Sequence, residues 1–124
     1  MKITTFDPVI VTPAADNVVK LFEELGFVTS HNPTAKPPGA SVPVFRMKHE
    51  KGFHIDILDK KDIPRDITNI RMNVDDFDEA FEILRSHGFR ELYPDAPHDS
   101  ESHRGCEMIS PAGMTITLMQ HIKK

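Results

Sequence analysis

Seven side chains that could bind or transform a small molecule are expected on one face of four predicted strands. They are Asp7 on the first strand, His54 and Asp56 on the fourth, Asn69, Arg71 and Asn73 on the fifth, and Thr117 on the eighth. Residues i and i+2 of a strand share a face, and apolar residues lie beside these polar ones. Convergent polar groups among apolar neighbours are typical of ligand sites, so we expect these seven residues to bind a ligand.

Arg71 is the candidate with the most specific chemistry. Its planar guanidinium suits a carboxylate or phosphate-like group, which favours an anionic organic ligand. The alternative is an internal ion pair with Asp56 or Asp7, because buried arginine is normally paired. Both interpretations hold if a ligand displaces that pair.

His54 and Asp56 are the weak candidates for catalysis. An imidazole beside a carboxylate could carry a proton near neutral pH. A solvated strand face is the favoured alternative, since the seven histidines of the chain show no metal-ligand spacing. No catalytic residue is therefore assigned.

Cys106 is the only cysteine, which excludes a disulfide within the chain. A nucleophilic thiol needs a base and an electropositive setting, and the neighbours Arg104 and Glu107 do not supply them. We expect a small core residue instead. Tyr93, His98 and His103 flank a polar loop, where they either close over a ligand or form plain surface, the second being favoured.

The elements that position these residues are clearest in residues 67–89. Apolar residues first alternate strictly with polar ones, which predicts a strand, and then recur at spacings of three and four, which predicts a helix. Asp75 or Asp76 is the expected cap of this helix, and Gly88 is its expected terminator. The strand has Ile70, Met72 and Val74 on its apolar face, and the helix has Phe77, Ala80, Phe81 and Leu84.

A second copy of this pattern lies upstream. Residues 7–27 align with residues 69–89 at an offset of 62, and residues 52–58 align with 113–119 at an offset of 61. This indicates an internal duplication. The upstream helix is predicted to be capped by Thr12, with Pro13 in its first turn, and to bury Val18, Leu21, Phe22 and Leu25.

Each copy predicts the order strand, helix and three strands. The first module covers residues 1–60, the second covers residues 66–122, and residues 59–66 connect them. Neither module alone has enough apolar residues for a core, so we expect one domain over residues 1–124.

Three segments resemble the vicinal oxygen chelate superfamily, which includes glyoxalase I, bleomycin-resistance proteins and extradiol dioxygenases. They are EELGF (Glu23–Phe27), NVDDFDEAFEILRSHGF (Asn73–Phe89) and SPAGMTITLM (Ser110–Met119). The resemblance implies an α+β fold in which two tandem βαβββ modules form a cupped, mostly antiparallel sheet with helices on its convex face. It also implies a homodimer, as in many members.

In metal-using members of that superfamily, four side chains on strands 1, 4, 5 and 8 hold a divalent ion, usually as His, Gln or Glu. The matching positions here are Asp7, Asp56, Asn69 and Thr117, and all four depart from that pattern. Transition ions favour nitrogen, sulfur or several carboxylates, so no transition metal or other cofactor is predicted. The alternative is weak binding of a hard ion such as magnesium.

Composition narrows the class of partner. The formal net charge is −4 with no basic stripe, so no nucleic acid is expected. No apolar run could span a membrane, the first residues lack the apolar core of a signal peptide, and a cytoplasmic protein is expected.

Three functions stay open. The first is sequestration of a small organic molecule without a metal, as in bleomycin-resistance proteins. The second is a metal-dependent lyase, isomerase or dioxygenase with a degenerate site, and the third is a non-catalytic dimeric module. Whether the chain is an enzyme is not decided.

Overall fold

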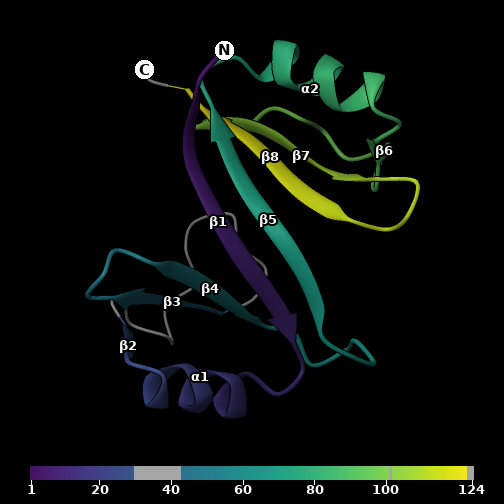
Figure 1. Cartoon of the computed structure of the whole chain (residues 1–124). Coiled ribbons are helices and arrows are strands. Elements are labelled where there is room, and N and C mark those ends of the chain that lie inside the picture. Colours follow the sequence, from purple (N-terminus) through teal and green to yellow (C-terminus); the bar gives the residue numbers. More distant parts are fainter. Residues whose placement is uncertain (30–42, 101, 123–124) are drawn as a thin grey trace. The chain divides into compact units, whose positions relative to one another are not determined.

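The computed structural model describes residues 1–29, 43–100 and 102–122 (Figure 1). The strand-helix-three-strand order occurs twice, which confirms the predicted α+β fold and its two βαβββ modules. The elements are β1 (Ile3–Thr12), α1 (Ala15–Glu24), β2 (Phe27–Thr29), β3 (Val44–His49), β4 (His54–Asp59), β5 (Ile67–Val74), α2 (Phe77–Ser86), β6 (Arg90–Glu91), β7 (His103–Ile109) and β8 (Thr115–His121). The Pro- and Gly-containing loop predicted at residues 32–40 lies outside the described residues.

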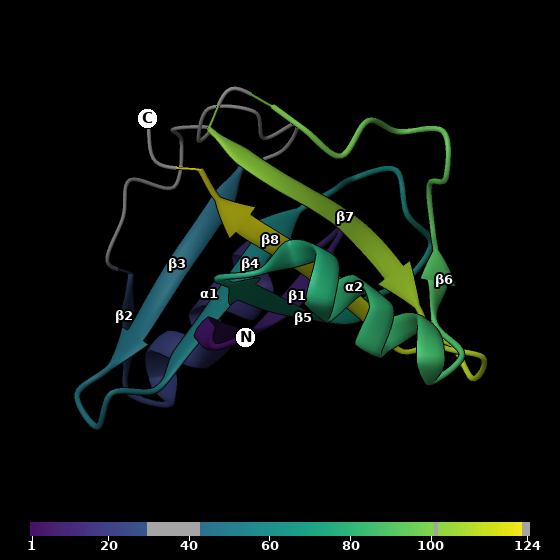
Figure 2. The same cartoon turned by 90° about the horizontal axis from the view of Figure 1, so that it is seen from above.

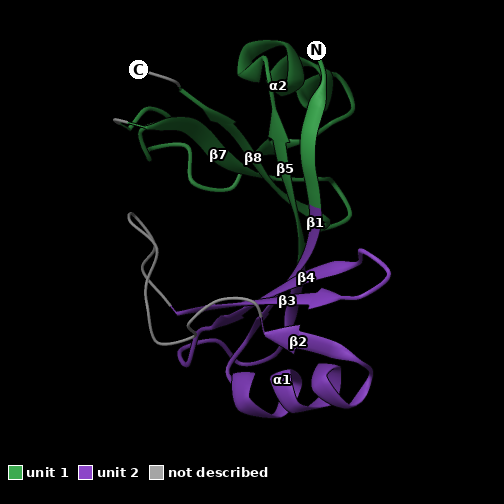
Figure 3. Cartoon of the chain, turned by 90° about the vertical axis from the view of Figure 1, so that its left-hand side faces the viewer, with its two compact units in different colours: residues 1–6, 69–124 green, residues 7–68 purple. Residues whose placement is uncertain are grey.

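The chain divides into two compact units (Figure 3). Unit 1 contains Met1–Phe6 and Asn69–Lys124, and unit 2 contains Asp7–Thr68. Strand β1 contributes its first residues to unit 1 and its remaining residues to unit 2.

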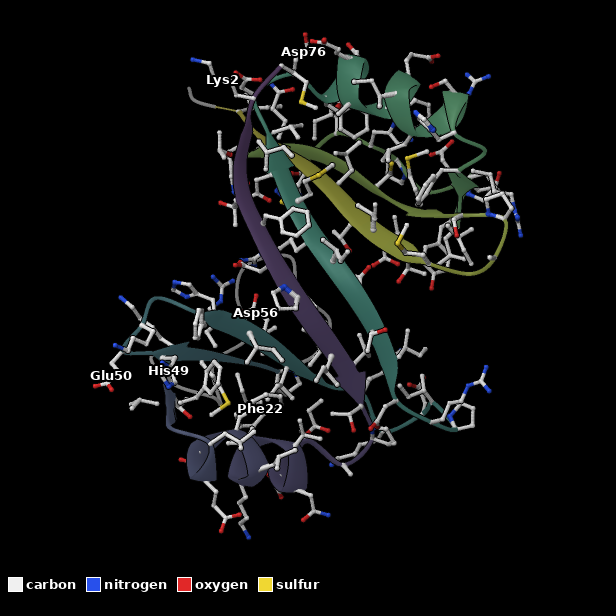
Figure 4. The ribbon with its side chains drawn as sticks, in the orientation of Figure 1. Lys2, Phe22, His49, Glu50, Asp56 and Asp76 are labelled. Atoms are coloured by element: carbon white, nitrogen blue, oxygen red, sulfur yellow. The ribbon has the colours of Figure 1, made fainter. Side chains whose placement is uncertain are left out.

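Unit 2 has the strand order β2-β3-β4-β1. The pairs β2–β3 and β3–β4 are antiparallel, whereas β4 and β1 are parallel. Helix α1 packs on this sheet, and Figure 4 shows Phe22 directed from α1 toward the strands. The buried core is Ala15, Met47, Ile55 and Ile57, with Val18, Val19 and Phe22 packed against it.

The predicted apolar stripe of α1 was wrong at two positions. Leu21 and Leu25 are 50% and 58% exposed, respectively. The buried stripe runs through Ala15, Val18, Val19 and Phe22 at spacings of three and four. The helix is therefore rotated relative to the prediction, and the fully buried Ala15 lets its first turn approach the strands closely.

The start of α1 also differs from the prediction. Thr12 is fully buried and ends β1, where it pairs in register with Asp59. The helix begins at Ala15, and its N-cap, Ala14, has no side-chain cap. The Thr12 hydroxyl accepts a hydrogen bond from the Ala14 N–H at 3.0 Å, so it stabilises the turn before the helix.

Unit 1 has the strand order β5-β8-β7-β6, with β5–β8 parallel and the other two pairs antiparallel. Helix α2 packs across β8 (Figure 2). The predicted apolar faces of the fifth strand and the second helix are confirmed. The core consists of Met72, Val74, Phe77, Ala80, Met108, Ile116 and Leu118, with Ile70, Phe81, Leu84, Phe89 and Cys106 packed against it.

Both ends of α2 follow the prediction. The Asp76 carboxylate caps the helix by accepting a hydrogen bond from the Glu79 N–H at 3.1 Å. Gly88 follows the helix with a φ of 90°, a conformation that favours glycine. The Lys2 N–H donates to the Asp75 carboxylate at 2.6 Å, and Figure 4 shows Lys2 close to Asp76 at this end of α2.

Candidate functional site

Three predicted ligand-binding residues follow one another on a single face of β5. Asn69, Arg71 and Asn73 alternate with the core residues Met72 and Val74, so their side chains leave the opposite face of the sheet. In register with them on β8 lie Thr115, Thr117 and Met119. This face of unit 1 therefore combines amides, a guanidinium, hydroxyls and a thioether.

The structure brings Asn69 and Thr117 into contact. The Asn69 side-chain amide donates to the Thr117 hydroxyl at 2.7 Å. Arg71 is partly buried, lies opposite Thr117 in register, and has an interaction partner in the folded chain. A ligand that binds the Arg71 guanidinium would either bind beside that partner or replace it.

Asn73 lies deeper in the sheet than its two neighbours. Only 8% of its surface is exposed, and its side-chain amide nitrogen lies 3.2 Å from Nε2 of His121. A neutral His121 with Nε2 unprotonated accepts this hydrogen bond. Asn73 therefore holds the end of β8 beside β5.

The predicted residues of unit 2 lie on β1 and β4. Asp56 is 5% exposed and lies in register with Val9 on β1 and Arg46 on β3. Opposite charges directly across two strands stabilise a sheet. Asp7 and Asp56 each have an interaction partner, whereas His54 is exposed and faces Lys48 across the hairpin.

The sequence prediction missed Arg46 as a neighbour of Asp56. The turn predicted at residues 50–52 places His49 opposite Phe53. In an antiparallel hairpin each step back along the first strand matches one step forward along the second, so residue 46 lies opposite residue 56. The observed hydrogen bond from the His49 N–H to the Phe53 carbonyl, at 2.9 Å, fixes this register. Extending the predicted strand pairing from the turn to these residues would therefore have identified Arg46 as the neighbour of Asp56.

The four positions that match the superfamily's metal ligands are divided between the units, with Asp7 and Asp56 in unit 2 and Asn69 and Thr117 in unit 1. Their donors are two carboxylates, an amide and a hydroxyl, and the amide of Asn69 is bonded to the hydroxyl of Thr117. Nickel, zinc and iron sites in proteins take imidazole, thiolate or several carboxylates. Neither pair of positions contains an imidazole or a thiolate.

A cleft of about 370 Å³ opens in unit 1. Strands β7 and β8 supply His103, Gly105, Cys106, Glu107, Thr117 and Met119, and the segment before β7 supplies Tyr93, Ala96, Pro97, His98, Asp99 and Ser100. Two backbone hydrogen bonds hold that segment along β7: from the Leu92 N–H to the Glu107 carbonyl at 2.9 Å, and from the Gly105 N–H to the His98 carbonyl at 2.8 Å. The segment thus forms one wall of the cleft.

Three potential metal ligands meet beside this cleft. One ligand atom each from Glu91, His98 and Cys106 lies within 4.8 Å of the others, and all three residues are partly buried. His98 Nε2 is hydrogen-bonded to a carboxylate oxygen of Glu91. The His98 ring packs against the rings of Phe77 and Phe81, with centroids 5.5 and 5.8 Å away.

The sequence prediction treated these residues separately. His98 was favoured as loop surface and Cys106 as a core residue without a basic partner. The structure does pack Cys106 against the core, but it also places His98 beside the thiol. No short motif encodes this cluster, because hydrogen bonds to β7 fold the segment back onto the strand.

The thiol of Cys106 is poorly suited to act as a nucleophile. Burial raises its pKa to about 11, and the nearby carboxylates of Glu91 and Glu107 contribute in the same direction. Thiolate is the reactive form, so at neutral pH the side chain is protonated and inert. The sequence-based argument against a nucleophilic Cys106 agrees with this environment.

No family model matches this chain, and no curated protein matches it by sequence. The structure is nevertheless similar to solved ones. A variant of glyoxalase I from Zea mays is 12% identical with a TM-score of 0.73, over 98% of this chain and 44% of that one. A methylmalonyl-CoA epimerase from Streptomyces coelicolor is 17% identical with a TM-score of 0.61, over 94% and 96% of the two chains.

A glyoxalase/bleomycin resistance protein/dioxygenase superfamily member from Vibrio splendidus is 11% identical with a TM-score of 0.61, over 96% and 99% of the two chains. The chain therefore has the fold of the vicinal oxygen chelate superfamily, as its motifs predicted. It spans less than half the length of the maize glyoxalase I chain. In the part of the chain that the structure describes, no helix is both long and apolar enough to cross a membrane.

Proposed function

We propose that this chain, built on the fold of the vicinal oxygen chelate superfamily, binds a small organic anion on the polar face of unit 1. One observation carries the proposal. Thr117 lines the 370 Å³ cleft, accepts a hydrogen bond from Asn69, and lies in register with Arg71. The polar row of β5 and the cleft thus share a residue.

The walls and polar groups of this region suit such a ligand. Met119 and Tyr93 supply apolar surface, and Thr117, Ser100 and His103 supply hydroxyl and imidazole groups. Pockets that combine apolar walls with a few oriented polar groups are typical of small-molecule sites. Arg71 supplies the planar, bidentate group that recognises a carboxylate or phosphate.

We infer that binding does not use a transition ion at the superfamily's metal positions. Asp7, Asp56, Asn69 and Thr117 lack the imidazole donors that such an ion prefers. Sequestration of the ligand, without bond chemistry, is the simplest function for this donor set. One superfamily fold neighbour, the Streptomyces coelicolor epimerase, was solved in complex with 2-nitronate-propionyl-CoA, so acyl-CoA compounds belong among the ligands to be tested.

A ligand screen with two arginine variants tests this proposal. Thermal-shift measurements on small carboxylates, phosphates and acyl-CoA compounds would select ligands, and calorimetry would give their affinities. Charge-assisted hydrogen bonds contribute about 1.5–3 kcal/mol each, so Arg71→Ala is expected to weaken an anionic ligand by roughly 10- to 100-fold. Arg90→Ala is the control, because Arg90 is exposed on β6 and lies outside the cleft lining.

The measurement separates the competing functions. Equal affinities for the wild type and Arg71→Ala would contradict the role of Arg71. Binding that appears only after nickel, zinc, manganese or magnesium is added, and that is lost in Asp56→Asn, would favour a metal-dependent enzyme. Absence of binding across the whole panel would favour a structural module.

A further inference from the structure

We propose that Glu91, His98 and Cys106 form a site for one borderline-soft divalent cation, for which Zn²⁺ is the best match. The site lies on β6, β7 and the segment between them, in unit 1 (Figure 1). It shares no residue with Asp7, Asp56, Asn69 and Thr117, the positions that match the superfamily's metal ligands. It also goes beyond the ligand-binding function proposed above.

The three donors are a thiolate-forming sulfur, an imidazole and a carboxylate, which together match zinc better than magnesium or calcium. Zinc binds such donors at about 2.0–2.3 Å, so ligand atoms around a tetrahedral ion are roughly 3.3–3.8 Å apart. The three atoms in this cluster are already within 4.8 Å of one another. Side-chain adjustments of an ångström or less would therefore complete the geometry.

The scaffold restricts all three side chains. Glu91 and Cys106 lie on β6 and β7, which are hydrogen-bonded neighbours. His98 is held by its carbonyl, which accepts from the Gly105 N–H, and by ring contacts with Phe77 and Phe81. A site with restricted ligands loses little conformational freedom when it binds an ion.

The charge around the cluster also favours a cation. The carboxylates of Glu91 and Glu107 both act on the Cys106 thiol. Arg104, a cation on the same strand, forms ion pairs with Asp78 at 3.1 Å and with Asp99 at 2.9 Å. A divalent ion would compensate the negative potential and stabilise the thiolate.

Three protein ligands leave one coordination position for water or another small molecule. His98 and Cys106 both line the 370 Å³ cleft, so this position would be reachable from it. The site thus has the ligand number of an open zinc centre rather than of a closed structural one.

Cobalt substitution provides a test that does not depend on any activity. The purified full-length chain would be stripped with a chelator and titrated with Co²⁺, and then with Zn²⁺ in competition. We expect one ion per chain, tetrahedral visible bands and a near-ultraviolet sulfur-to-cobalt charge-transfer band. Zinc should abolish these bands and protect the single cysteine of the chain from thiol reagents.

Three variants and one control locate the ion. Changing a residue that only hydrogen-bonds to a zinc ligand costs roughly 10- to 100-fold in affinity, so Cys106→Ser, His98→Ala and Glu91→Gln, which remove ligands themselves, should each weaken binding by at least about 100-fold. The charge-transfer band should be absent in Cys106→Ser even when cobalt is in excess. His87→Ala should bind like the wild type, because His87 is an exposed histidine at the C-cap of α2 and is not one of the three ligands.

Circular dichroism and the melting temperature of each stripped variant would show whether it is folded. A folded wild type that shows no charge-transfer band would overturn the proposal. Equal cobalt affinity in the wild type and Cys106→Ser would overturn it as well. Loss of anion binding in Arg71→Ala with cobalt binding intact would separate this site from the one proposed on β5.

Discussion

At Cys106, the surroundings control the chemistry of a single sulfur atom. Burial and two carboxylates raise its pKa to about 11 from an ordinary value of 9.0. At pH 8, about one thiol in a thousand is then ionised, compared with about one in ten for an ordinary cysteine. With chelator present, the folded chain should therefore react with iodoacetamide about 100-fold more slowly than the denatured chain, and its rate should rise with pH up to about 11.

The same shift makes stability depend on alkaline pH. Below about pH 9, the thiol is protonated in both the folded and the unfolded chain, so its contribution is constant. Between about pH 9 and 11 the unfolded chain ionises more readily, so unfolding becomes more favourable. Urea titrations should show a larger loss of stability over this range for the wild type than for Cys106→Ala, which lacks the group. Parallel losses would contradict the raised pKa.

Individual contacts were the least predictable feature of this sequence. The face on which Asn69, Arg71 and Asn73 lie could be predicted from the alternation of apolar and polar residues, because successive side chains of a strand point to opposite faces of the sheet. The proximity of His98 to Cys106 did not follow from local pattern, because it depends on hydrogen bonds that hold the segment before β7 along that strand. Long-range contacts of this kind are set by tertiary packing, which local pattern does not encode.

At the scale of elements, two glycines allow a direct comparison. Gly88 and Gly113 have φ values of 90° and 101°. A Cβ at Gly88 would lie 3.0 Å from Cγ of Pro111, whereas a Cβ at Gly113 would meet nothing within 4 Å. We expect Gly113→Ala to cost about 1–2 kcal/mol through backbone strain and Gly88→Ala to cost about 1 kcal/mol more.

Urea denaturation of both variants would measure these costs. The difference between them isolates the contact with Pro111, because the backbone strain is similar at the two positions. Equal destabilisation would show that Pro111 moves aside without cost.

The cap of α2 gives a second prediction. The Asp76 carboxylate accepts a hydrogen bond from the Glu79 N–H, so Asp76→Ala should destabilise the chain by about 1 kcal/mol, and Asp76→Asn by less. Glu82→Ala is the control, because Glu82 is an exposed acidic residue of the same helix that pairs with Arg85 at 3.4 Å and does not cap the helix. That variant should cost less than about 0.5 kcal/mol. Similar effects of Asp76→Ala and Glu82→Ala would contradict the cap.

The two helices show where element-level prediction succeeded and failed. For α2, the aspartate cap, the four-residue stripe and the terminal glycine all indicate the same helix, and the structure agrees. For α1, several apolar residues offer overlapping stripes, and the prediction chose Leu21 and Leu25. Packing instead selects the stripe containing Ala15, because a small residue allows the helix to approach the sheet.

At the scale of the whole molecule, the repeated hydrophobic pattern was the most informative feature. Two aligned segments at nearly the same offset predicted two βαβββ modules, and the observed order of elements has this repeat. The compact units differ from the sequence modules, since Met1–Phe6 belongs with the second half of the chain. That assignment depends on long-range packing of β1, which the repeat alone does not specify.

The sizes of the two cores make a prediction about cooperativity. Among the described residues, six apolar side chains are buried in unit 2 and seven in unit 1. Each unit has roughly 60 residues, a size at which a single core is only marginally stable, and β1 contributes to both units. We therefore expect one unfolding transition for the whole chain. Met47→Ala in unit 2 and Met108→Ala in unit 1 should each lower its stability by about 2–5 kcal/mol.

Tyr93, the only tyrosine, reports on unit 1, whereas far-ultraviolet circular dichroism reports on the whole chain. In urea, the two signals should change together in the wild type and in both variants. The decisive case is Met47→Ala, whose side chain is 1% exposed in unit 2. If it moves the dichroism curve and leaves the Tyr93 curve in place, the units unfold separately. If both curves move together, loss of packing in one unit destabilises the other, as expected when neither core is sufficient alone.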